Sequence, residues 1–148
     1  MITVYDYTGF KPEGEVEKAL SFACNELGVD NITVVVTLNE KLLRKLSKYE
    51  VEYQAVLFKN KDLKHIYNLC FRPRLNQATY TEIIAHEAVH LSQQERGELS
   101  LNLSNGECRW KGELFTADYP YMERPWEREA FKVQSEILRQ YKKSKKRK

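Results

Sequence analysis

The sequence predicts an α+β domain in which a small, mostly antiparallel sheet packs on an N-terminal helix, a central helix and a C-terminal helix. Three observations lead to this fold class. Short β-branched or alternating apolar runs recur in the first half of the chain. Apolar residues at helical spacing mark three longer segments. The 148 residues are enough for one domain with its own hydrophobic core.

The N-terminal segments are assigned from their apolar spacing. Residues 2–7 form a short strand, and residues 13–27 form a helix that ends at Gly28. The run ITVVVTL at 32–38 is almost continuously apolar, which is typical of a central strand. Asn39 is a good N-cap residue, so we expect a short helix after this strand.

Two pairs of strands are expected further along. Residues 51–58 and 63–71 have the composition of strands, and the turn-like KNKD between them predicts a β-hairpin. After the central helix, residues 107–110 and 113–116 are expected to pair as short strands around Lys111-Gly112.

The central helix is expected at 79–96 and contains the motif His86-Glu87-Ala88-Val89-His90. Thr79, with Glu82 three residues later, indicates a capping box at its start. Residues four apart share a helix face, so both imidazoles can bind one ion at Zn–N distances of about 2.0–2.1 Å. Glu87 is rotated by about 100° from the first histidine and is placed to reach a metal-bound water. The motif therefore predicts a zinc site in a hydrolase, with Glu87 as general base.

A third ligand must lie outside the motif, because a catalytic zinc usually has three protein ligands and one open position. No histidine follows His90, and His65 is interpreted as an ordinary strand residue, so we expect a carboxylate. A helix packed beside the motif helix would hold it firmly, and the last helix begins PWEREA. Its first turns offer Glu127 and Glu129, which differ by about 200° around the helix axis. The residues alone leave both carboxylates open.

The positive charge of the chain is concentrated at its C-terminal end. Residues 142–148, KKSKKRK, carry six of the 24 Lys and Arg residues, which leaves 18 against 21 Asp and Glu in residues 1–141. We therefore expect a domain at 1–141 and a basic, disordered tail at 142–148. Such a tail suits contacts with the phosphates of a nucleic acid.

The expected location is the cytoplasm. The N-terminus has neither a basic start nor a long apolar stretch, and no apolar run approaches the roughly 20 residues that span a bilayer. Cys24, Cys70 and Cys108 are odd in number and lack the spacing of metal ligands, which is typical of free thiols in a reducing compartment. Cys108 is a remote ligand candidate, because it alone of the three follows the motif.

The blocks HEAVHLSQQERG, WKG and PWEREA resemble small single-domain phage and bacterial metallopeptidases of the minimal gluzincin type, with the pattern HExxH…ExxA. The resemblance covers about residues 79–131 and implies a minimal zincin-like domain. It implies Glu127 as the third zinc ligand, three residues before a small residue, Ala130, that lets the two helices approach. In large gluzincins an Asp often follows the small residue, whereas this chain has Phe131 there. The resemblance therefore leaves unassigned the residue that would hydrogen-bond the zinc-binding histidines.

The resemblance also implies how a substrate would bind. An extended peptide would pair with the strand before the motif helix, His65–Phe71, as an edge strand. The oxyanion of the transition state would need a donor besides zinc, and three residues before the ligand helix are candidates. They are Tyr119, Tyr121 and Arg124.

The function expected on these grounds is a zinc metallopeptidase that cleaves peptide bonds. His86, His90 and Glu127 bind Zn²⁺, and Glu87 deprotonates the attacking water. The alternative is a catalytically silent module in which zinc holds the fold. Such a module would bind a partner, and residues 142–148 favour a nucleic acid.

Overall fold

The structure is a computed structural model that describes residues 1–47 and 53–146. Within these residues it contains four α-helices, a four-stranded sheet and a three-stranded sheet. The predicted α+β class is therefore confirmed. In the same part of the chain, no helix is long and apolar enough to cross a membrane.

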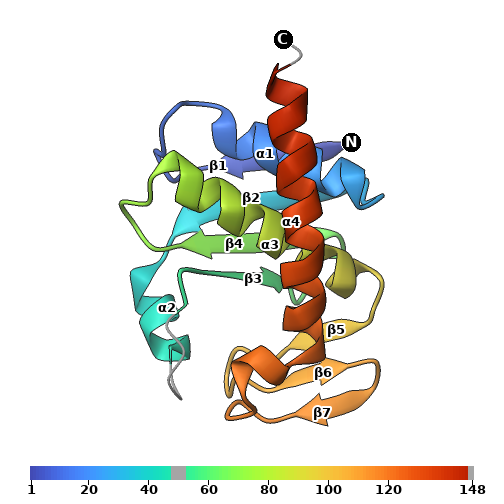
Figure 1. Ribbon diagram of the computed structural model, residues 1–148. Coiled ribbons are helices and arrows are strands. Elements are labelled where there is room, and N and C mark those ends of the chain that lie inside the picture. Colours follow the sequence, from blue (N-terminus) through green and yellow to red (C-terminus); the bar gives the residue numbers. More distant parts are fainter. Residues whose placement is uncertain (48–52, 147–148) are drawn as a thin grey trace.

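The larger sheet has the strand order β1-β2-β4-β3 (Figure 1). Its strands are β1 (Ile2–Asp6), β2 (Ile32–Leu38), β3 (Ala55–Lys59) and β4 (Ile66–Phe71). β1 and β4 both run parallel to β2, and β3 runs antiparallel to β4. The prediction of a mostly antiparallel sheet is therefore wrong. The reason is helix α1 (Glu15–Glu26), which returns the chain across the sheet so that β2 starts at the same end as β1.

The predicted hairpin of β3 and β4 is confirmed for the residues described, while residues 51 and 52 lie outside them. However, β4 lies between β2 and β3, so the implied substrate-binding edge at His65–Phe71 is wrong. Strand β3 forms this edge and packs against α3 (Gln77–Glu95). The error arises because a hairpin sequence does not tell which of its two strands joins the rest of the sheet.

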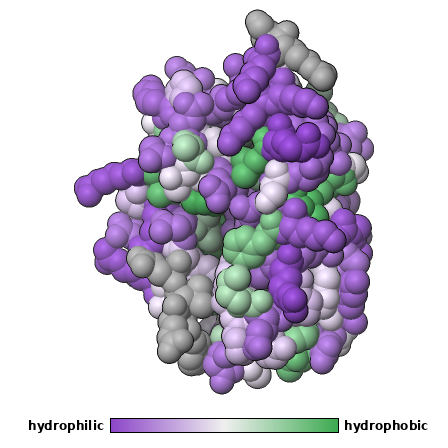
Figure 2. Space-filling view, viewed as in Figure 1, coloured by the Kyte–Doolittle hydropathy of each residue, from purple (hydrophilic) through white to green (hydrophobic). Residues whose placement is uncertain are grey.

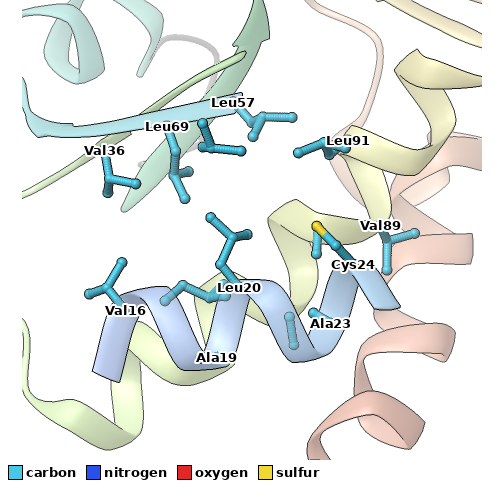
Figure 3. Close-up of a cluster of buried hydrophobic side chains, with 14 of the residues drawn as sticks. Val16, Ala19, Leu20, Ala23, Cys24, Val36, Leu57, Leu69, Val89 and Leu91 are labelled. Atoms are coloured by element: carbon cyan, nitrogen blue, oxygen red, sulfur yellow. The ribbon is translucent and has the colours of Figure 1, made fainter. Parts of the chain in front are cut away.

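Helices α1 and α3 cover one face of the larger sheet. In Figure 3, Val16 and Leu20 of α1 face Val36 and Leu69 of the sheet, and all four side chains are fully buried. Burial of a side chain such as Leu20 contributes about 1.5–3 kcal/mol. Helix α2 (Glu40–Leu46) covers the opposite face through a smaller apolar cluster.

The starts of α2 and α3 are both capped by an asparagine. Asn39 accepts a hydrogen bond from the Leu42 amide at 3.0 Å, as its sequence position predicts. The start of α3 differs from the prediction, because Asn76 is its N-cap and accepts from the Thr79 amide at 2.9 Å. Thr79 thus lies inside the first turn, and the capping box predicted for it is wrong. Asparagine at position 76 offers a cap earlier in the chain, and it adds one turn before the motif.

The segment after α3 forms a three-stranded antiparallel meander. The strands are β5 (Leu99–Leu101), β6 (Cys108–Trp110) and β7 (Glu113–Phe115). The predicted pair is β6 and β7, joined at Lys111 and Gly112, which have φ of 50° and 88° as a tight hairpin turn requires. Strand β5 was not predicted. The meander buries Trp110 and Phe115 against Trp126, at the start of the last helix.

Helix α4 (Pro125–Lys146) follows a short 3₁₀ turn, η1 (Tyr121–Glu123), crosses α3 and continues to α1 (Figure 1). The sequence predicts a disordered tail at 142–148. This prediction is wrong for residues 142–146, which are helical, while residues 147–148 lie outside the described residues. Tyr141 donates a 2.6 Å hydrogen bond to buried Glu15 of α1, and Lys145 forms an ion pair with the same carboxylate. Lysines in the last turn also suit the helix dipole. Figure 2 shows a largely hydrophilic surface on this face of the molecule.

We expect Tyr141→Phe to destabilise the protein by about 1–2 kcal/mol, because the Glu15 carboxylate loses a donor inside the protein. For a chain of this size, the loss corresponds to a decrease in Tm of about 3–6 °C in thermal unfolding. The matched control is Tyr7→Phe, which makes the same chemical change on a ring that is 69% exposed. Equal shifts in the two variants would contradict a role of this hydrogen bond in holding the end of α4.

Candidate metal centre

The metal-ligating residues that the sequence predicts come from two packed helices. His86 and His90 lie one turn apart on the face of α3 that meets α4. Glu127 lies in the first turn of α4. Ala130, one turn further along, is fully buried and has no side-chain bulk to separate the two helices. The packing therefore brings the carboxylate against both imidazoles.

The three side chains present their ligand atoms to one another. The Nε2 atom of His86 lies 2.8 Å from Glu127 Oε1, and the Nε2 atom of His90 lies 2.9 Å from the same oxygen. The two Nε2 atoms are 3.1 Å apart. A tetrahedral zinc ion with bonds of about 2.0–2.1 Å needs ligand atoms about 3.3 Å apart, so the group fits such an ion after small outward shifts. Among the described residues, these three form the group that can hold a metal ion.

The electrostatics of the group favour a cation. His86, His90 and Glu127 are all buried, with 6–8% of each residue exposed. Burial by itself raises the pKa of Glu127, but the charge of His90 and hydrogen bonds from both imidazoles outweigh burial and hold that pKa well below its usual value. Burial lowers the pKa of His90, but the Glu127 carboxylate outweighs it and raises that pKa to about 9. Glu127 thus stays ionised, and its field attracts positive charge to the imidazoles.

Glu87 is buried beside the group and faces open space on two sides. One cavity of about 100 Å³ lies between α3 and the three-stranded sheet, with Leu99, Leu101 and Trp126 in its wall. A second cavity of about 390 Å³ lies between β3, α3 and α4, with Ile83 and Phe131 in its wall. Both cavities are lined by Tyr53, Ala55, Glu87 and Tyr121. Burial raises the pKa of the Glu87 carboxyl above its usual value.

Of the two carboxylates that the sequence leaves open, the structure places Glu127 at the histidines. Glu129 points elsewhere: its Oε1 atom accepts from the Gln93 amide at 3.2 Å and pairs with Arg96 at 3.4 Å. His65 lies apart from the group, where its ring bonds Glu95. Cys108 is buried in the wall of the smaller cavity and is outside the metal-binding group.

The three oxyanion candidates have different surroundings. The Tyr121 hydroxyl donates to Glu127 Oε1 at 3.0 Å and so lies at the metal-binding group. Tyr119 packs its ring on Phe115, away from the group. Arg124 is buried and donates to the Tyr53 hydroxyl and to the carbonyls of Ala117 and Tyr119. Among the three, Tyr121 has the geometry of a donor at the site.

Sequence reasoning missed two glutamines that contact the histidines. Gln134 Oε1 lies 2.6 Å from Nδ1 of His86, and Gln93 Oε1 lies 2.8 Å from Nδ1 of His90. The sequence spacing of each glutamine from a predicted site residue could have indicated that it lies near the histidines. Gln93 follows His90 by three residues, and Gln134 follows Glu127 by seven, so each lies on the same helix face as its reference residue. Phe131 instead packs its ring on His86, with ring centroids 4.7 Å apart.

Comparison with known proteins returns no matching family model, curated protein or solved structure. The function is therefore argued from the geometry of the site.

We expect Glu127→Ala to weaken zinc binding by at least about tenfold, or about 1.4 kcal/mol, because one of three ligands is lost. Glu129→Ala should weaken it far less, because that carboxylate lies at Gln93 and Arg96. Competition titrations of both variants against a chelator of known affinity measure the difference, with circular dichroism as a check of folding. A larger loss in Glu129→Ala would contradict the assignment of Glu127.

Proposed function

We propose that this protein is a zinc-dependent metallopeptidase of the minimal gluzincin type. The observation that carries the proposal is the convergence of His86, His90 and Glu127 beside Glu87, at the junction of two cavities. Two imidazoles and one carboxylate are a ligand set of catalytic zinc, and they leave a position for water. A zinc ion that only held the fold would not need an acid facing open space at its side.

The residues of the chain divide the chemistry between them. His86, His90 and Glu127 would hold zinc. As a Lewis acid, zinc would polarise the substrate carbonyl, and it would lower the pKa of a bound water to about 7. Glu87 accepts the proton of the attacking water and passes it to the leaving amine. Its raised pKa makes the carboxylate a stronger proton acceptor than an ordinary glutamate.

Tyr121 is the oxyanion donor in this proposal. Its hydroxyl is 3.0 Å from Glu127 Oε1 and it lines both cavities, so a substrate carbonyl at the site lies within its reach. Burial raises the pKa of Tyr121 far above its usual value, which keeps the hydroxyl protonated and able to donate. Arg124 instead donates to Tyr53 and to backbone carbonyls, so it supports the wall of the site.

The substrate class that fits the site is an extended peptide. Strand β3 is an edge of the larger sheet, and its first residue, Ala55, lines both cavities. A peptide paired with this edge would run past Glu87 and place its side chains in the two cavities. The smaller cavity has a mainly apolar wall, with Leu99, Leu101 and Trp126.

A second candidate function is supported by the basic end of α4. Lys142, Lys143 and Lys146 are exposed in its last turns, next to the basic residues 147 and 148. A cluster of this kind can bind nucleic-acid phosphates with a strong dependence on salt. In that case zinc would stabilise a module that binds a nucleic acid.

We expect Glu87→Gln to keep the fold and bind zinc with unchanged affinity while it loses peptide hydrolysis by at least about a hundredfold. An amide cannot take a proton from water, and the three ligands are untouched. Cleavage of a peptide library, followed by mass spectrometry, gives the rate, with Glu17→Gln on the surface of α1 as the matched control. Equal rates in Glu87→Gln and the parent protein would exclude Glu87 as the general base.

The nucleic-acid hypothesis has its own test. Replacement of Lys142, Lys143 and Lys146 by Gln leaves the Lys145 contact with Glu15 in place and removes three exposed charges. If these lysines bind phosphates, affinity for a single-stranded oligonucleotide falls, and the slope of log K against log salt becomes shallower by about 0.7 per contact.

The control for this test removes the same charge from a different surface. It replaces the exposed lysines Lys41, Lys61 and Lys64 by Gln. Equal affinities for the two triple variants would end the hypothesis that the end of α4 binds nucleic acid.

A further inference from the structure

Arg124 is a buried cation whose hydrogen-bond partners are all neutral. It is 6% exposed. Its Nε atom donates to the Tyr119 carbonyl at 3.1 Å, Nη1 to the Tyr53 hydroxyl at 3.0 Å and Nη2 to the Ala117 carbonyl at 2.9 Å. Among the described residues, no carboxylate forms an ion pair with this guanidinium. Removal of a charge from water is unfavourable unless an opposite charge compensates it, so Arg124 is set to bind an anion.

The guanidinium has donors left for such a partner. An arginine carries five N–H groups, one on Nε and two on each Nη atom. Each of the three nitrogen atoms of Arg124 donates once to an internal acceptor, so one N–H group on each Nη atom has no partner within the described part of the chain. Donors on two nitrogen atoms of one guanidinium match the two oxygen atoms of a carboxylate.

The guanidinium belongs to the wall of the smaller cavity, which Glu87 and Glu127 also line. Its Cζ atom lies 5.5 Å from the ring centre of Tyr121 and 6.0 Å from that of Trp126, and both rings line the same cavity. A group bound in this cavity therefore lies between the candidate metal centre and a buried positive charge.

The two cavities beside Glu87 differ in their other charges. Apart from Glu87 and the metal-binding group, the charged residues that line the smaller cavity are Arg124 and the exposed Lys45, which are both positive. The larger cavity is lined by the acid Glu82 and, among the described residues, by no lysine or arginine. A carboxylate is therefore attracted to the smaller cavity and repelled from the larger one.

The rest of the smaller cavity suits the carbon atoms that carry a carboxylate. Leu99, Leu101 and Trp126 supply apolar wall. The volume of about 100 Å³ is several times the roughly 10–15 Å³ that one water molecule needs. The cavity thus has room for a group of several non-hydrogen atoms, such as a carboxylate with its neighbouring methylene groups.

We propose that Arg124 binds a carboxylate group of the substrate in the smaller cavity. The carboxylate belongs either to an acidic side chain or to the C-terminal end of the peptide, since both share this chemistry. The proposal rests on the proposed function for the peptide, and it adds the chemical class of the group that the cavity accepts. With zinc bound, Glu87 and Glu127 would balance the charge of the ion, which leaves the charge of Arg124 for the substrate.

The test compares peptides that differ only in a carboxylate. One pair is a capped pentapeptide of alanine with a central glutamate or glutamine, and the other is acetylated trialanine with a free or amidated C-terminus. Calorimetry on the zinc-loaded protein gives the dissociation constants. We expect at least about tenfold tighter binding of the carboxylate member of one pair, which identifies the source of the carboxylate. Equal affinities within both pairs would overturn the proposal.

Variants separate Arg124 from the zinc ion and from Lys45 as the partner of the carboxylate. Arg124→Lys keeps the positive charge, but an ammonium group has three donors, which the three internal acceptors take. We expect this variant to lose the preference for the carboxylate peptide at unchanged zinc content, measured by elemental analysis. The matched control is Arg109→Lys on the exposed side of β6, which should keep the preference. A preference that survives Arg124→Lys would contradict the proposal.

A measurement on the unchanged protein decides the matter if Arg124→Lys does not fold. In protein labelled with ¹⁵N-arginine, the Nη signals of Arg124 should shift when the preferred carboxylate peptide binds and stay in place with its amide counterpart. Unshifted Nη signals in the presence of a bound carboxylate peptide would overturn the proposal.

The result is distinguishable from the fate of the proposed function. If the peptides are cleaved, the ratio of their kcat/KM values replaces the ratio of dissociation constants. Binding that depends on the carboxylate and on Arg124, without any cleavage, would contradict the peptidase and leave the carboxylate site standing. Cleavage without a preference for either carboxylate would support the peptidase and contradict the role of Arg124.

Discussion

The close packing of α4 on α3 at Ala130 is the contact on which the site depends. The histidines of the motif share one helix face, but a carboxylate reaches them only if a second helix comes near. Ala130 permits this approach, and Glu127 lies one turn before it. The helix is held at both ends, since Trp126 packs on the three-stranded sheet and Tyr141 bonds Glu15 on α1. The two ends thus fix the distance between Glu127 and the two histidines.

The parts of the site that could be predicted from the sequence follow from helical periodicity within one segment. The spacing of His86, Glu87 and His90 sets their directions on α3 whatever surrounds the helix. Selection of Glu127 over Glu129 required the resemblance to gluzincins, in addition to the periodicity of α4. The helices and the strands of the larger sheet were found for the same reason, because each has a strong local pattern.

The parts that could not be predicted depend on contacts between segments distant in the sequence. The order of β3 and β4 in the sheet is decided by which strand β2 pairs with, and no local pattern encodes that choice. Gln93 and Gln134 resemble ordinary polar residues of helix surfaces. Their contacts with the histidines form only when α3 and α4 pack together, so their spacing becomes informative after the packing is known. The helical end of α4 was missed because the partner of Lys145 is Glu15, 130 residues away.

Charge balance explains why neutral amides suit these two positions. Glu87 and Glu127 are both buried, and a charge taken out of water costs several kcal/mol unless it is compensated. With the proposed divalent cation bound, the two carboxylates and the cation would sum to zero, and the glutamines would leave that sum unchanged. Carboxylates in their place would bury four acids around one ion. In the proposed mechanism, Glu87 becomes neutral when it takes a proton from water, so the negative charge moves from its carboxylate to the oxyanion and the sum stays unchanged.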